Sequence, residues 1–71
     1  MLARTTEEQR VKLAKLMISM NVPKEETLDI MTALGTVTEL RIFLDKLSER
    51  NFQMTPEEVY QAMLDTIAEA I

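Results

Sequence analysis

Apolar residues recur every three or four positions in four stretches of the chain, and short polar segments separate these stretches. Residues at this spacing share one face of an α-helix, so the pattern is typical of amphipathic helices. It predicts four helices, at about residues 6–20, 23–34, 37–50 and 56–70. We therefore expect residues 1–71 to form one all-α domain, with a compact three-helix core and a fourth, C-terminal helix.

Three helix starts carry the same four-residue signal, T-x-x-E/Q, at Thr6–Gln9, Thr36–Glu39 and Thr55–Glu58. In such a capping box the Thr hydroxyl accepts a hydrogen bond from the N3 backbone N–H, and the Glu or Gln side chain accepts one from the N-cap N–H. Pro23 and Pro56 suit the first position of a helix, where the missing N–H costs nothing. The structural role of Thr6, Thr36 and Thr55 is therefore predicted to be helix capping.

Two residues are predicted to end helices through a left-handed backbone. Asn21 follows the first helix, and Asn tolerates this conformation better than most residues. Gly35 is the only glycine and follows the second helix, where we expect it to adopt a positive φ.

The apolar stripes are wide for so small a core, which predicts that part of them faces a partner. We expect Leu28 to point into the core and Phe52 to fold back onto it, because both are strongly apolar. Met20 and Met54 lie at helix junctions and are the methionines expected to be exposed. The predicted partner is another protein or a second copy of the chain.

Charge is unevenly distributed along a chain whose net charge is −4. Residues 1–20 hold four basic and two acidic groups, whereas residues 51–71 hold four acids and no base. Attraction between the two ends, across the fold or across a dimer, is one interpretation, and an acidic solvent face of the last helix is the other. The acidic balance disfavours nucleic acid and anionic membranes, which bind basic surfaces.

The sequence lacks the residue types that several kinds of active site require. The chain has no His and no Cys, which removes histidine bases and the usual zinc ligands, and one Gly does not make a phosphate-binding loop. We predict no catalytic residues, no cofactor and no metal. The N-terminal residues lead into charge, unlike a secretory signal, and the longest apolar run has three residues, so a cytoplasmic location without membrane contact is expected.

Residues 13–47 combine an apolar turn, a second helix with early acids, a Gly fifteen residues after the turn, and a third helix with an acidic–apolar pair. In chain order these features are carried by Met20, Asn21, Val22, Glu25, Glu26, Leu28, Gly35, Glu39 and Leu40. This spacing resembles the ubiquitin-associated (UBA) domain, a three-helix interaction module. The resemblance implies a partner-binding surface made of the first turn and the end of the third helix, namely Met20, Asn21, Val22, Leu44 and Leu47.

Two other functions fit the same helices. The second and third helices have the outline of a helix-turn-helix, in which Arg41, Lys46 and Arg50 would meet DNA. A small acidic inhibitor or accessory subunit of a larger protein, of the kind that mobile genetic elements encode, also agrees with the size and charge. The leading hypothesis remains a non-catalytic protein–protein interaction module.

Overall fold

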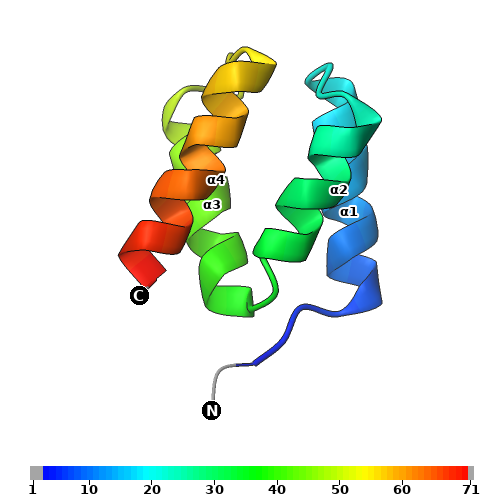
Figure 1. Cartoon of the computed structure of the whole chain (residues 1–71), viewed down its shortest axis with the longest axis vertical. Coiled ribbons are helices and arrows are strands. Elements are labelled where there is room, and N and C mark those ends of the chain that lie inside the picture. The colour runs from blue at the N-terminus through cyan, green and yellow to red at the C-terminus, as the bar shows by residue number, and fades with distance from the viewer. Residues whose placement is uncertain (1–2, 71) are drawn as a thin grey trace.

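The chain folds as four helices that alternate in direction (Figure 1). The computed structural model describes residues 3–70. Within them the helices are α1 (Glu7–Ser19), α2 (Lys24–Ala33), α3 (Val37–Glu49) and α4 (Pro56–Ala70). The predicted all-α fold is confirmed, and each predicted helix boundary lies within one residue of the observed one. No helix in residues 3–70 has the length and apolar character needed to cross a membrane.

The helix starts agree with the capping signals. In α1 the Gln9 N–H donates to Thr6 Oγ1 at 3.1 Å, and the Thr6 N–H donates to the Gln9 side chain at 2.8 Å. The same reciprocal pairs join Thr36 to Glu39 and Thr55 to Glu58. Each pair satisfies two N–H groups that have no partner inside the helix.

Helix α2 begins differently, because Pro23 stands one residue earlier than predicted, at the N-cap, with no side-chain hydrogen bond. Glu26 occupies the N3 position, where a capping box would place its carboxylate on the N-cap N–H. Proline has no N–H to donate. Accordingly, Glu26 Oε2 is buried without a hydrogen-bond partner among the described residues.

Helices α1 and α3 end in the same way, through an asparagine with positive φ. Asn21 has φ 64° and Asn51 has φ 53°. The Asn21 N–H donates to the Ile18 carbonyl at 3.0 Å, and the Val22 N–H donates to the Met17 carbonyl at 3.0 Å. This pair of bonds is a Schellman motif, which confirms the prediction for Asn21.

The prediction for Gly35 is wrong, because no glycine in the described chain has a positive φ. The turn after α2 is held instead by the N-terminal segment, which pairs antiparallel with it at Arg4 and Thr36. The Thr5 N–H donates to the Gly35 carbonyl at 3.1 Å, and the Val37 N–H donates to the Ala3 carbonyl at 2.8 Å. These bonds give partners to the Gly35 carbonyl and the Val37 N–H, whereas a left-handed glycine would have capped carbonyls at the end of α2.

The four helices form two antiparallel hairpins, α1–α2 and α3–α4, which join mainly through α2 and α4 (Figure 1). Helix α4 therefore packs on α3 and α2 of its own chain. No Cα atom of α1 lies within 8 Å of one in α3 among the described residues. The hairpins thus close against each other on the α2–α4 side and stay apart on the α1–α3 side.

The core is filled from all four helices, and its fully buried side chains include Met17, Ile30, Phe43 and Val59. Seven further apolar side chains pack around it while remaining partly exposed. Five large apolar side chains stay exposed among the described residues: Val11, Ile18, Leu28, Phe52 and Leu64. The apolar surface thus exceeds what this small core covers.

The predictions that Leu28 and Phe52 face the core are wrong. Leu28 is 53% exposed, because α2 turns Thr27, Ile30 and Leu34 toward the core and Leu28 lies on the other side of the helix. The buried Thr27 hydroxyl is satisfied by the Pro23 carbonyl at 3.0 Å. Phe52 is 42% exposed rather than folded onto the core.

Candidate interaction surface

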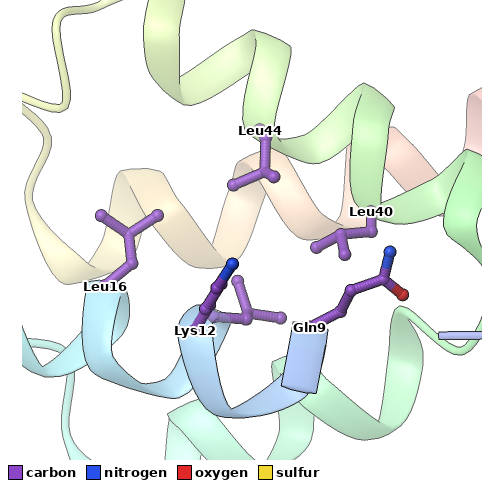
Figure 2. A pocket seen from close by; sticks show the side chains of 6 residues that line it. Gln9, Lys12, Leu16, Leu40 and Leu44 are labelled. Atoms are coloured by element: carbon purple, nitrogen blue, oxygen red, sulfur yellow. The ribbon is translucent and has the colours of Figure 1, made fainter. Parts of the chain in front are cut away.

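An apolar groove lies between α1 and α3, where the two hairpins stay apart (Figure 2). It encloses about 270 Å³ and is lined by Gln9, Lys12, Leu13, Leu16, Leu40 and Leu44. Leu13 and Leu40 are buried and form its floor, whereas Leu16 and Leu44 are half-buried and form its walls. The groove therefore exposes leucine side chains that the core leaves incompletely covered.

Helix periodicity explains why these side chains meet. Gln9, Leu13 and Leu16 are spaced by four and three residues on α1, and Leu40 and Leu44 are spaced by four on α3, so each set lies on one face. Figure 2 shows Leu44 and Leu40 projecting from α3 toward Leu16 and Lys12 of α1. Because the two backbones do not approach closely, the leucine tips leave a channel between them.

A second hollow, of about 340 Å³, continues this surface toward the turns after α1 and α3. Leu16 lines both hollows, so the two hollows adjoin at this residue. The lining of the second hollow is Leu16, Ser19, Met20, Asn21, Phe52, Gln53 and Met54. From Gln9 to Ser19 the depression follows α1 for about 15 Å, or nearly three helical turns. We call this whole depression the α1–α3 groove.

Phe52 lines the second hollow, and its backbone is strained. It follows Asn51 with φ 58°, a left-handed conformation that is uncommon for bulky side chains. The Phe52 N–H donates to the Leu47 carbonyl at 2.9 Å, which closes the Schellman motif of α3 and fixes the backbone there. The motif thus holds an exposed ring beside the hollow.

Charge along the groove is sparse. Lys12 is the only charged side chain that lines the two hollows described above, and it pairs with Glu8 at 3.5 Å on the exposed surface of α1. Arg41 and Asp45 lie on the outer side of α3, in a shallower hollow that shares Gln9, Leu40 and Leu44 with the groove. The floor of the first hollow is therefore apolar, with charges at its edges, whereas Ser19, Asn21 and Gln53 bring polar groups to the second hollow.

The five residues predicted to bind a partner separate into two groups. Asn21 and Leu44 reach the surface and line the groove. Met20 lines the second hollow but is only 8% exposed, which corrects the expectation that it is exposed.

Val22 and Leu47 are buried in the core, because the Schellman turn folds Val22 inward and Leu47 shares the inward face of α3 with Phe43. Met54 is half-buried beside the second hollow.

Leu16 and Phe52 are two apolar lining residues that the sequence did not identify as part of a site. Leu16 lies between two apolar stripes of α1, a signal for a residue at the edge of the core. Phe52 follows Asn51, and an Asn after a predicted helix end indicates a left-handed turn that can project the next residue outward.

Two of the three basic residues proposed to meet DNA are engaged by α4. Lys46 pairs with Glu69, and this hydrogen bond raises the pKa of the lysine above its ordinary value. Arg50 Nη2 donates to Glu58 Oε2 at 2.7 Å. The Thr55 backbone N–H, followed by Arg50, lowers the pKa of Glu58 below its ordinary value. Of the three, Arg41 alone has no carboxylate partner within the described residues.

The described part of the chain brings no three His, Cys, Asp or Glu residues together in a way that suits a metal ion. Comparison of the sequence and structure with protein-family models, curated proteins and solved structures finds no match. The resemblance to UBA domains therefore stays a prediction.

Proposed function

We propose that the protein is a non-catalytic protein–protein interaction module, and that the α1–α3 groove is its binding surface. The supporting observation is the separation of α1 from α3, which leaves Leu16 and Leu44 half-exposed over a floor of Leu13 and Leu40. An amphipathic helix of a partner can lay its apolar face into such a groove through anchors spaced by three, four and seven residues. The groove is long enough for about three turns of such a helix.

Electrostatics favour a protein partner over DNA. A DNA-binding face needs a cluster of free basic side chains. On α3, Lys46 and Arg50 are paired with carboxylates of α4, and the net charge of the chain is −4. The helix-turn-helix hypothesis is thus the less supported of the two. The hypothesis of an acidic inhibitor or accessory subunit differs only in the identity of the partner.

The experiment compares two identical substitutions on different surfaces. Leu44→Gln places a polar group in the wall of the groove, whereas Leu28→Gln alters a more exposed leucine on α2 outside it. Tagged wild-type protein and both variants are used to isolate partners from cells of the native host, and any partner is then purified and titrated. Circular dichroism establishes that both variants remain folded.

We expect a partner that binds the wild type and Leu28→Gln equally and binds Leu44→Gln at least about tenfold more weakly, equivalent to about 1.4 kcal/mol. Equal binding by all three proteins would contradict the assignment of the groove. Failure to recover any partner, together with a strictly monomeric wild type, would contradict the proposed function.

A further inference from the structure

The surface of α4 contains an apolar ridge that matches the groove. Leu64 is 44% exposed, and Tyr60 and Ile67 beside it are half-buried. The three residues are spaced by four and three positions, so they form a stripe along one side of α4. This is the anchor spacing with which an amphipathic helix fills a hydrophobic groove. We call Tyr60, Leu64 and Ile67 the α4 ridge.

An acid beside the ridge and a lysine of the groove carry opposite charge. Helix α4 contains four acidic residues and no basic one, whereas the charged side chain that lines the groove is Lys12. Glu58 and Glu69 are paired with α3. Asp65 accepts a hydrogen bond from Gln61 and lies near Lys46. Glu57 has no basic partner within the described residues, and it shares the face of Leu64 because it lies seven residues earlier. Glu57 is thus available to a basic surface.

The fold prevents these charges from meeting within one molecule. Helix α1 packs on α2, helix α4 packs on α3 and α2, and no Cα atom of α1 lies within 8 Å of one in α4 across the described chain. Figure 1 shows the two helices at opposite sides of the arrangement. The attraction predicted between the two ends of the sequence is therefore unsatisfied in the monomer and is available between molecules.

From these relationships we infer that the groove binds a second copy of this chain, which inserts its α4 ridge between α1 and α3. Leu64 enters between Leu16 and Leu44, and Glu57 beside the ridge approaches Lys12. The exposed i,i+4 pair of Lys12 with Glu8 contributes little, because both side chains are largely surrounded by water. Lys12 can therefore exchange partners readily. This inference rests on the proposed function, and it names the occupant of the same groove.

The contact joins two different surfaces, so it is heterologous. A heterologous contact leaves one free groove and one free ridge on every dimer, so the assembly either closes into a ring or grows as an open filament. A single helix in a groove is a small interface, and interfaces below about 1,200 Å² are weak and transient. We expect reversible association in the range of about 10 μM to about 1 mM, decreasing with ionic strength because exposed charges are screened.

The test uses two variants, each of which disables one of the two contact surfaces, the groove or the α4 ridge. Leu44→Gln disables the groove and retains the ridge, whereas Leu64→Gln disables the ridge and retains the groove. Each variant alone should sediment as a monomer, and an equimolar mixture should form a 1:1 complex and nothing larger. Leu28→Gln, the matched control, should associate like the wild type. Should Leu44→Gln fail to fold, Lys12→Glu takes its place with a smaller expected effect, a severalfold weakening of association, since the Lys12 side chain is 75% exposed and outside the core.

Charge reversal provides a second readout. Lys12→Glu should weaken self-association severalfold, and Glu57→Lys in the other molecule should restore it. A wild type that stays monomeric at all concentrations would overturn self-docking, as would a Leu64→Gln variant that still associates or a mixture that stays monomeric. If a monomeric wild type nevertheless binds a distinct partner that Leu44→Gln loses, self-docking fails while the proposed function stands.

Discussion

The Arg4 guanidinium lies against Gly35, so close that a Cβ atom on residue 35 would be 3.1 Å from Arg4 Nη2. In the same N-terminal segment the Thr5 N–H donates to the Gly35 carbonyl, and the Ala3 carbonyl accepts from the Val37 N–H. The turn between α2 and α3 is therefore held by a segment some thirty residues away in sequence. A glycine at this position allows the close approach of Arg4 and is not needed for a left-handed backbone.

Gly35→Ala should change the free energy of unfolding by no more than about 0.5 kcal/mol. The backbone does not require a positive φ, and the nearest atoms belong to the flexible end of Arg4, which can move by a few tenths of an ångström. Chemical denaturation measures the effect, and surface changes of this kind stay within that range. A loss above about 1 kcal/mol would show that the turn is more tightly constrained than the structure indicates.

Asn21→Val should destabilise the protein by more than about 1 kcal/mol. A β-branched residue is strongly disfavoured at φ 64°, and the Schellman bonds of α1 depend on that conformation. Asn21→Gly is the control, since glycine adopts positive φ freely and should leave stability nearly unchanged. Equal effects of both changes in thermal melts would contradict a left-handed turn at this position.

Thr36→Ala should cost about 1 kcal/mol, the usual effect of removing an N-cap side chain. The Thr36 hydroxyl accepts the Glu39 N–H at 3.2 Å and also donates to the Glu39 carboxylate at 2.8 Å. Thr36→Ser keeps the hydroxyl and should preserve most of the stability. Thr38→Ala changes an exposed threonine outside the cap and should have little effect. Denaturant titrations of the three variants give the comparison.

Glu58→Gln should flatten the dependence of stability on pH under acidic conditions. The folded pKa of Glu58 is lowered from 4.5 by the Thr55 backbone N–H and by Arg50. The unfolded chain therefore binds the proton more readily, and stability rises with pH across that window. The contribution of Glu58 is complete above the unfolded pKa and is lost as pH falls through the folded pKa.

Thermal melts between about pH 5 and about pH 3 test this prediction, since acid destabilisation arises from such carboxylates. The neighbouring Glu57→Gln is the control, because Glu57 takes no part in the cap among the described residues. Parallel pH profiles for the wild type and Glu58→Gln would disprove the role of this carboxylate.

Local signals in the sequence were sufficient to locate the helices. The boxes at Thr36 and Thr55 predict helix starts because a cap involves only residues three positions apart. Asn21 predicts a helix end for a similar reason. Gly35 shows the limit of this approach, since its turn is held by residues 3–5, and no short-range pattern reveals a pairing with a distant segment.

The candidate site was only partly predictable. Leu44 lies at the edge of the stripe on α3, and an edge position marks a residue that packs incompletely. The rotation of α2 that exposes Leu28, and the gap between α1 and α3 that exposes Leu16, depend on how the hairpins pack. Periodicity identifies which residues share a face of one helix, but it does not determine which neighbour covers that face.

The most direct test of the groove uses methyl NMR on the Leu64→Gln variant, labelled at its leucine methyl groups, while unlabelled Leu44→Gln is added. The labelled molecule has an intact groove, and the added molecule has an intact α4 ridge. We predict saturable shifts of the Leu13, Leu16, Leu40 and Leu44 methyl signals, with Leu28 unaffected. Leucine signals that stay in place throughout the titration, or that shift only outside the groove, would contradict the account.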